Sequence, residues 1–172
     1  SALNGGEKFT KLDFSDAYFQ VELDDESKKY CVINTHKGLY RYNRMPFGIA
    51  SAPAIFQAAM EKVFQGCKCV CYLDDVLVTG RDDREHLRNL EEVFQRIREH
   101  GMRLGLAKCK FMQDSVEYLG HVIDKNGVHP SPRRIEAIVN IPRPESVQEV
   151  RHFMGIVQYY GRFIPDLSTK CS

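Results

Sequence analysis

Residues 69–78 have the sequence Cys69-Val-Cys-Tyr-Leu-Asp74-Asp75-Val-Leu-Val78, in which two adjacent carboxylates separate two short apolar stretches. This pattern predicts a β-hairpin with Asp74 and Asp75 near its tip. Adjacent carboxylates repel each other, so they are costly unless water or cations surround them. A solvated turn would explain the pair, because aspartate is common in turns. A divalent-metal site would explain it too, because Mg²⁺ prefers carboxylate oxygens and takes only one or two from the protein.

A third acid lies in a similar setting upstream. Residues 8–14 alternate as a strand does, and Asp13 is isolated between Leu12 and Phe14. If this strand lies beside the hairpin, Asp13 meets Asp74 and Asp75 at one end of a sheet. Three carboxylates can hold two Mg²⁺ ions about 3.5–4 Å apart, the arrangement used for in-line phosphoryl transfer. The pattern therefore predicts that the three carboxylates converge on one metal site.

Hydrophobic periodicity and capping signals predict the other elements. Helices are expected over 51–65, over 82–100, briefly after Ser131 and over 146–160. Strands are expected over 19–23, 30–35, 39–42 and 116–124, and from 128 onward after an Asn126-Gly127 turn. Strands interspersed with two packing helices predict an α+β fold, with an antiparallel sheet and helices on one face. A subdomain boundary is expected near residue 125.

Composition narrows the class of protein. The chain has 172 residues, 43% hydrophobic and 27% charged, as in globular proteins rather than disordered ones. It has no apolar run of 18 residues that predicts a membrane span and no stretch resembling a signal peptide. A net charge of +1 argues against a strongly basic nucleic-acid coat.

The six cysteines allow several kinds of chemistry. They are Cys31, Cys67, Cys69, Cys71, Cys109 and Cys171. An even number permits disulfides. Three of them repeat every second residue, which places them on one face of a strand, but no nearby histidine or CxxC pair completes a zinc site. We expect reduced, metal-free thiols in an intracellular protein.

Several stretches, in order, resemble the motifs of reverse transcriptases. Residues 9–20 (FTKLDFSDAYFQ) resemble motif A, residues 40–48 with 51–57 resemble motif B, and Tyr72-Leu-Asp-Asp75 is similar to the YxDD box of motif C. Residues 100–104 with 108–111 resemble motif D, and residues 117–121 resemble motif E, the primer grip. Residues 143–165 resemble the segment that follows in Ty3/gypsy-type LTR-retrotransposon polymerases. The chain thus resembles a palm-centred fragment of an RNA-directed DNA polymerase.

The resemblance implies a division into parts. The palm, an antiparallel sheet with packed helices, would comprise residues 1–20 and 52–125. Residues 21–51 would be part of the fingers, and residues 126–172 the start of the thumb or connection. The chain begins just before motif A, so the preceding fingers hairpin is expected to be missing, and no RNase H or integrase segment follows.

The resemblance also implies a reaction. A primer 3′-hydroxyl would attack the α-phosphorus of a dNTP, on an RNA or DNA template, with two Mg²⁺ ions or Mn²⁺ as a substitute. The other partners would be the remaining parts of a Pol polyprotein (fingers, RNase H and integrase), and no membrane. The expected location is intracellular and cytoplasmic, in the virus-like particle of the parent element.

The family's residue roles carry over by position. Asp13, Asp74 and Asp75 match the catalytic, metal-binding carboxylates, and the Phe14 carbonyl would be an additional metal ligand. The dNTP would meet the backbone amides of Ser15, Asp16 and Ala17, the Tyr18 ring, Phe47, Gly48, and a motif D lysine, either Lys108 or Lys110. An aromatic ring at Tyr18 leaves no room for a 2′-hydroxyl, whereas the two lysines could instead be an exposed basic pair. The primer would meet Tyr72, Tyr118, Leu119 and Gly120.

Two other functions compete with polymerisation. A truncated or domesticated palm could bind nucleic acid or protein without turnover; the missing fingers favour this alternative and the three aspartates oppose it. A two-metal nuclease would use the same carboxylates. Hydrolysis needs neither Tyr18 nor a primer grip, which argues against the nuclease.

Overall fold

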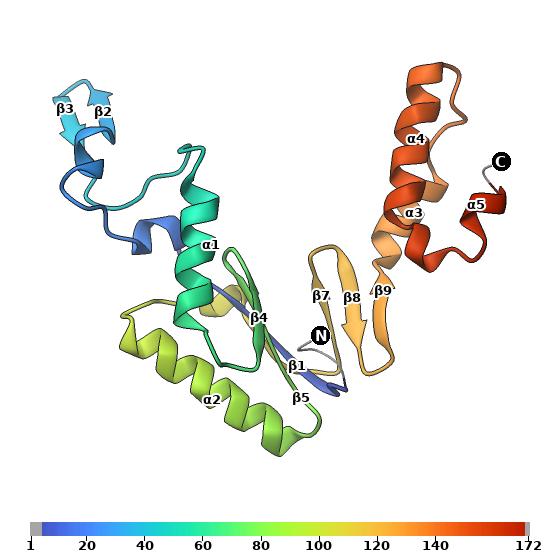
Figure 1. Cartoon of the computed structure of the whole chain (residues 1–172), viewed down its shortest axis with the longest axis horizontal. Coiled ribbons are helices and arrows are strands. Elements are labelled where there is room, and N and C mark those ends of the chain that lie inside the picture. The colour runs from blue at the N-terminus through green and yellow to red at the C-terminus, as the bar shows by residue number, and fades with distance from the viewer. Residues whose placement is uncertain (1–4, 171–172) are drawn as a thin grey trace. The chain divides into compact units, whose positions relative to one another are not determined.

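The computed structural model describes residues 5–170 and divides into two compact units, residues 1–116 and 117–172 (Figure 1). We call them the N-terminal unit and the C-terminal unit. The predicted boundary near residue 125 lies inside the second unit, because two paired strands enclose that position. None of the helices within residues 5–170 is both long and apolar enough to cross a membrane.

The N-terminal unit is built on a four-stranded sheet in the order β4-β5-β1-β6 (Figure 1). The strands are β1 (Lys8–Asp13), β4 (Cys69–Tyr72), β5 (Asp75–Gly80) and β6 (Lys110–Gln113). All neighbouring pairs are antiparallel, as predicted. The register of β1 against β5 runs from Lys8 opposite Gly80 to Asp13 opposite Asp75.

Two helices bury one face of this sheet. They are α1 (Ala52–Val63) and α2 (Asp83–Glu99). Side chains alternate between the faces of a strand, so Leu12, Val76 and Val78 share one face, and they join one buried cluster with the helices. The helix members of that cluster include Phe56, Met60, Leu90, Val93 and Ile97. Each such buried side chain contributes about 1.5–3 kcal/mol. The opposite face carries Lys11, Asp13 and Asp75 at one end, together with the buried Phe9 and Leu77.

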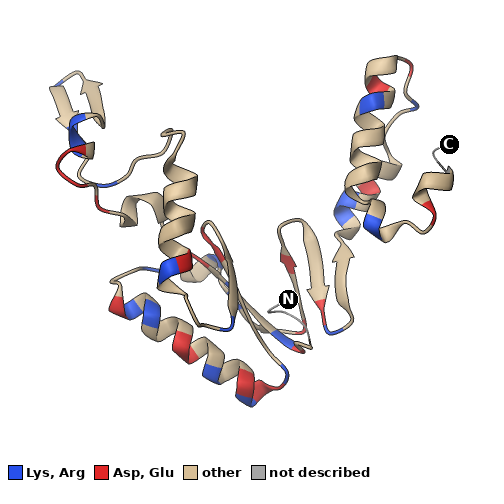
Figure 2. Ribbon diagram, in the orientation of Figure 1, with Lys and Arg blue, Asp and Glu red and all other residues tan. Residues whose placement is uncertain are grey.

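Helix α2 begins as its capping signal predicts. Asp82 accepts a hydrogen bond from the Glu85 amide at 2.7 Å, which satisfies one of the free N–H groups of the first turn. The Glu85 carboxylate binds Arg81 and Lys68, and the Arg81 hydrogen bonds lower the Glu85 pKa to about 2. Figure 2 shows acidic and basic residues interspersed along the helix, as expected of its solvated face.

The segment that follows β1 differs from prediction. Residues 19–23 were expected to form a strand, but the chain forms a 3₁₀ helix, η1 (Ala17–Gln20). Asp16 turns the chain with φ 49°, and the Gln20 side chain accepts the Arg103 amide at 2.7 Å. The segment is therefore anchored to a loop rather than to a sheet. Further along lie η2 (Ser27–Lys29), the hairpin of β2 (Val32–Thr35) and β3 (Gly38–Arg41), and, before β6, η3 (Leu106–Lys108).

The C-terminal unit combines a small sheet with helices. Its sheet has the order β7-β8-β9, with β7 (Ser115–Tyr118) starting just before the unit boundary, β8 (His121–Asp124) and β9 (Gly127–Pro130). After it come α3 (Pro132–Val139), α4 (Val147–Tyr159), η4 (Gly161–Phe163) and α5 (Leu167–Lys170). The single strand predicted over 116–124 is wrong, because Leu119 and Gly120 both take positive φ and turn the chain. The predicted turn before 128 uses Lys125 and Asn126, and Gly127 opens β9.

The cysteines in the described residues are free thiols. They are Cys31, Cys67, Cys69, Cys71 and Cys109, and Cys171 lies outside the described residues. Cys69 and Cys71 pair with Val78 and Val76 and pack against the core. Burial raises the pKa of both thiols to about 12, so both stay protonated and unreactive at neutral pH.

A buried polar network joins the sheet to α2. His86 and Thr10 are fully buried, with the His86 Nε2 atom 2.7 Å from the Thr10 hydroxyl. That hydroxyl accepts the Met112 amide at 3.2 Å, so its own proton is free to be donated to His86. Gly80 allows the close approach of α2, because a Cβ there would lie 2.3 Å from the His86 nitrogen. The network suits a neutral imidazole, whose Nε2 lone pair accepts the Thr10 proton.

Acidification should destabilise the protein through His86. Burial lowers the His86 pKa in the folded protein, so below its ordinary value of about 6.5 the unfolded chain binds more protons. We expect the free energy of unfolding in urea to fall as the pH decreases from 7 to 5, and His86→Gln to reduce this dependence. The matched control is His36→Gln, at an exposed position. An equal pH dependence in wild type and His86→Gln would contradict the assignment.

Candidate active site

The site is built on two aspartates that face each other across paired strands. Asp13 ends β1 and lies directly opposite Asp75, which begins β5. Tyr72 at the end of β4 lies opposite Asp75 on its other side. Directly opposed residues of antiparallel strands share a face, with Cβ atoms about 4.5–5.5 Å apart. Tyr72, Asp75 and Asp13 therefore form a row on the face opposite the buried cluster.

Two lysines neutralise the opposed carboxylates. The Lys11 ammonium is 2.9 Å from Asp75 Oδ2, and both side chains are less than a quarter exposed (22% and 23%). The Lys108 ammonium is 3.5 Å from Asp13 Oδ1. Like charges directly opposite in a sheet are destabilising, so these cations offset a repulsion that the register imposes. Lys11 was not predicted, although its position two residues before Asp13 places it on the same face.

Asp74 lies at the adjoining hairpin tip. Leu73 and Asp74 connect β4 to β5, and the Asp74 carbonyl accepts the Phe14 amide at 3.2 Å. Leu73 has φ 53°, a strained conformation that costs about 1–3 kcal/mol and is common at functional sites. The hairpin is confirmed, and it brings the backbone of Asp74 beside the end of β1.

The three carboxylates do not form a ready-made metal cluster. Within residues 5–170, no group of three His, Cys, Asp or Glu side chains is arranged to hold a metal ion. In the structure Asp13 lies directly opposite Asp75, whereas the Asp74 side chain is exposed. The expected convergence of all three is thus not seen in this part of the chain. Mg²⁺ sites that serve phosphate chemistry commonly take only one or two carboxylates and complete the shell with waters and substrate oxygens.

Asp13 nevertheless has the properties of a metal ligand. Its Oδ1 atom is buried and forms no hydrogen bond within the described residues, so the Lys108 ammonium at 3.5 Å is its recognised ionic contact, and the side chain is 15% exposed. A buried carboxylate oxygen whose ionic contact is this long, and comes from a side chain that is 74% exposed, is poorly compensated, and a bound cation would compensate it better. Hard carboxylate oxygens, one of them buried and without a hydrogen bond, fit Mg²⁺ or Mn²⁺.

An aromatic group flanks the predicted nucleotide position. The Tyr18 ring lies 5.0 Å from the Phe47 ring and 5.5 Å from the Phe56 ring, measured between centroids. Phe56 is fully buried and Phe47 is 60% exposed, so Tyr18 is held between the core and the surface. Gly48, with φ 90°, follows Phe47. The structure thus brings together Tyr18 and Phe47, two residues predicted to contact the dNTP.

Backbone hydrogen bonds join the loop of residues 103–109 to the end of β1. The Gly105 amide donates to the Asp13 carbonyl at 2.9 Å, and the Ser15 amide donates to the Arg103 carbonyl at 3.1 Å. The Ser15 N–H already donates a hydrogen bond within the protein. Of the three backbone amides predicted to donate to the triphosphate, those of Asp16 and Ala17 therefore remain. The same loop carries Lys108 beside Asp13. Lys110 instead lies opposite Lys11 in β6, so the geometry favours Lys108 as the lysine nearer the carboxylates.

The predicted primer grip forms a tight turn in the C-terminal unit. Leu119 and Gly120 have φ 50° and 77°, and Tyr118 before them is buried. His121 Nε2 lies 2.8 Å from the Arg162 guanidinium, which can only donate, so His121 Nδ1–H donates to the Leu119 carbonyl at 3.1 Å. A Cβ at Gly120 would come within 2.5 Å of the Arg134 guanidinium carbon. Both arginines therefore pack around this turn.

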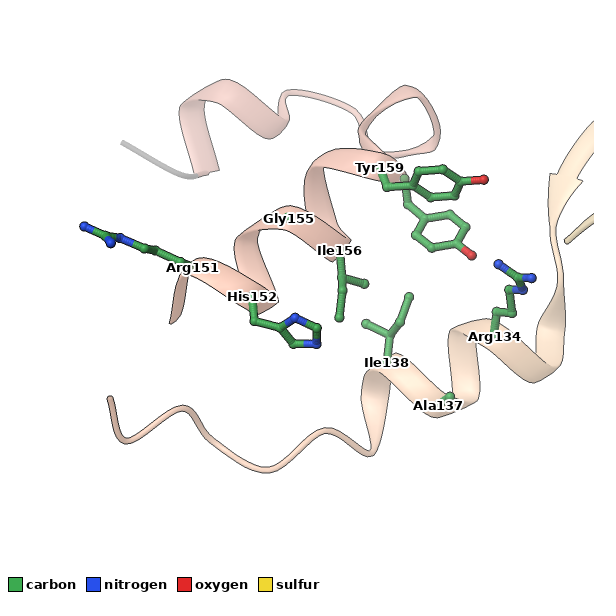
Figure 3. A pocket seen from close by; sticks show the side chains of 9 residues that line it. Arg134, Ala137, Ile138, Arg151, His152, Gly155, Ile156 and Tyr159 are labelled. Carbon is green, nitrogen blue, oxygen red and sulfur yellow. The ribbon is translucent and has the colours of Figure 1, made fainter. Parts of the chain in front are cut away.

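A cavity of about 790 Å³ lies between α3 and α4. Figure 3 shows Ile138 of α3 facing Ile156 and His152 of α4, whereas Arg151 points away. The remaining lining residues are Arg134, Ala137, Gly155, Tyr159 and Tyr160. The cavity includes none of the residues predicted to bind metal, nucleotide or primer.

Comparison with known sequences agrees with the motifs. Residues 1–123 match the family model described as reverse transcriptase (RNA-dependent DNA polymerase). The retrovirus-related Pol polyprotein from transposon 297 of Drosophila melanogaster is 36% identical over 161 residues, covering 92% of this chain and 15% of that protein. The corresponding polyprotein from transposon gypsy of the same species is 34% identical over 163 residues, covering 93% and 16%. The chain thus spans about a sixth of the length of these relatives.

Comparison with solved structures gives the same fold. A foamy viral protease-reverse transcriptase in complex with double-stranded DNA superimposes with a TM-score of 0.86 at 23% identity, over 95% of this chain and 29% of that one. A foamy viral protease-reverse transcriptase in complex with an RNA/DNA hybrid has a TM-score of 0.75 at 22% identity, over 90% and 21%. At these identities the likeness shows the fold alone.

Replacing Asp13 with asparagine should stabilise the metal-free protein. The change removes one of two opposed charges, and repulsion of this kind costs about 0.2–1 kcal/mol. We expect a higher Tm in EDTA and a smaller rise in Tm on adding Mg²⁺, both measured by thermal denaturation. Asp25→Asn, at a 97% exposed side chain, is the control. A lower Tm in EDTA, or an unchanged response to Mg²⁺, would count against the assignment.

Proposed function

The chain belongs to the reverse transcriptase family, and from that premise we propose that it carries the polymerising centre of a Ty3/gypsy-type retroelement Pol protein. In this reaction a primer 3′-hydroxyl attacks the α-phosphorus of a dNTP, on an RNA or DNA template. The observation that carries the proposal is the cross-strand pairing of Asp13 with Asp75 beside the hairpin tip that bears Asp74. The N-terminal unit supplies all three aspartates.

The aspartates would hold two Mg²⁺ ions, or Mn²⁺ in their place, with the Phe14 carbonyl as a further ligand. When bound, the ions would activate the primer hydroxyl and offset the charge on the leaving pyrophosphate. The buried Asp13 Oδ1 supports this role, because it forms no hydrogen bond within the described residues and meets Lys108 only at 3.5 Å. Lys11 holds Asp75 at 2.9 Å, so it would keep that carboxylate in position.

Other residues would bind and orient the substrates. The Asp16 and Ala17 amides would meet the triphosphate, since oriented N–H groups suit anions. Lys108, 74% exposed and beside Asp13, would donate a proton to the leaving pyrophosphate. Phe47 and Gly48 would lie along the nucleotide. Tyr72, 52% exposed in the row with Asp75, would contact the primer, as would the Tyr118–Gly120 turn.

The polyprotein relatives support the proposed partners. The chain would act with template, primer and dNTPs, together with the fingers, RNase H and integrase parts of a Pol protein. The proposed location is the cytoplasmic virus-like particle of such an element.

Asp74→Asn should abolish primer extension by the full protein that carries this chain. The substitution removes a proposed metal ligand while keeping its shape. We expect kcat/KM for dNTP incorporation to fall by at least about 10²–10³-fold, the range seen when one preorganised electrostatic group is lost. Asp25→Asn is the matched control. Extension at the wild-type rate would refute the role of Asp74, and a wild-type protein that binds primer–template without extending it would favour a binding module.

Tyr18 should set the choice of sugar. A ring under C2′ contacts deoxyribose and clashes with a ribose hydroxyl, so Tyr18→Val should raise the rNTP/dNTP ratio of kcat/KM. A clash of ~3 kcal/mol corresponds to about a hundredfold change in that ratio. Tyr18→Phe keeps the ring and should change the ratio little. An unchanged ratio in Tyr18→Val would make Tyr18 a packing residue only.

A further inference from the structure

The side chain of Gln57 in α1 bridges the outer edge of β4. Its Oε1 atom accepts the Leu73 amide at 2.7 Å, and its Nε2 atom donates to the Cys71 carbonyl at 3.1 Å. The same Nε2 donates to the Glu61 carboxylate at 2.9 Å. Both amide protons and one oxygen lone pair are thus used. Only one orientation of the amide satisfies these partners, because a flip would place donor against donor at Leu73.

This bridge reproduces the hydrogen bonding of a missing strand. β4 is the outer strand of its sheet, so its outward backbone groups lack a partner strand. In a parallel ladder, one residue of the neighbouring strand bonds the groups on either side of its counterpart. The Gln57 amide does the same around Tyr72, using the carbonyl before it and the N–H after it.

The bridged segment is the strained end of the hairpin. Leu73 has φ 53°, and its amide is one of the two groups that Gln57 holds. Its carbonyl accepts the Cys71 thiol at 3.5 Å. A turn in an unfavourable conformation persists only where its surroundings fix it, and Gln57 supplies a fixed partner from a helix packed into the core.

We propose that Gln57 is a positioning residue, which holds the Tyr72–Asp75 turn in the conformation that presents Asp74 and Asp75. This role rests on the proposed function, because it acts through those carboxylates. The Gln57 bridge differs from an ordinary hydrogen bond between two side chains on the surface of one helix. Gln95 and Glu99 in α2 form the same i, i+4 pair at 2.9 Å, but within residues 5–170 no hydrogen bond joins the Gln95 side chain to a strand.

Hydrogen–deuterium exchange at the Leu73 amide tests the bridge without any catalysis. Gln57→Met keeps the side-chain length and removes the hydrogen bonds. We expect Leu73 exchange to become about tenfold faster or more, the change expected when ordinary hydrogen bonds are lost locally. Exchange in the centre of β5 should stay unchanged. Gln95→Met is the matched control and should leave Leu73 as in wild type. Wild-type exchange in Gln57→Met would overturn the proposal, as would faster exchange throughout β5.

Primer extension by the full protein then tests the consequence. We expect Gln57→Met to lower kcat by about tenfold or more and to raise the Mg²⁺ concentration at half-maximal rate, with KM for primer–template within about twofold of wild type. Gln95→Met should retain wild-type kcat. An unchanged kcat alongside faster Leu73 exchange would refute the positioning role. If the wild-type protein showed no primer extension, the proposed function would fail. The exchange measurement would still show whether Gln57 holds the Leu73 amide.

Discussion

The antiparallel register of β1 against β5 is the constraint on which the site depends. It places Leu12 opposite Val76 and Thr10 opposite Val78, so that one face is buried against α1 and α2. The same register places Asp13 opposite Asp75 on the other face. A slip of one residue would exchange the two faces, so burial of the core fixes the two acids in opposition. Core packing therefore maintains an electrostatically unfavourable pair.

Several contacts stabilise the end of the sheet at which the carboxylates of Asp13 and Asp75 oppose each other. Lys11 and Lys108 bring positive charge to Asp75 and Asp13. The Asp74 carbonyl accepts the Phe14 amide, and the Asp13 carbonyl accepts the Gly105 amide, so the hairpin and the loop 103–109 are both tied to the strand end. Exposed ion pairs contribute little, but the Lys11–Asp75 pair is largely shielded. Backbone hydrogen bonds and shielded ion pairing thus preserve a site in which the buried Asp13 Oδ1 has a long contact to Lys108 but, within the described residues, no hydrogen bond.

Two cysteines in the strand beside this site, Cys69 and Cys71, nevertheless remain ordinary protonated thiols. Cys71 precedes Tyr72, yet its side chain lies on the core face, as does that of Cys69. Burial raises the pKa of both to about 12, which keeps them as thiols beside a strongly charged edge. At this end of the sheet, strand alternation therefore separates the core-facing Cys71 from the neighbouring Tyr72, which lies on the same face as Asp75 and Asp13.

The sequence by itself determined the elements whose signals are local: the hairpin around Asp74, the strand ending at Asp13, the helices α1 and α2, and the family resemblance. Only the tertiary structure decided which distant groups meet. Gln57 and Leu73 are 16 residues apart, and Lys108 reaches Asp13 from a loop that no local pattern places there. The strand predicted over 19–23 failed for the same reason, whereas the strand predicted over 116–124 was interrupted by a local turn. Alternating residues favour a strand, but Gln20 found its partner in Arg103 and the chain reversed at Leu119 and Gly120. Local pattern specifies which faces are buried, whereas long-range contacts select the partners.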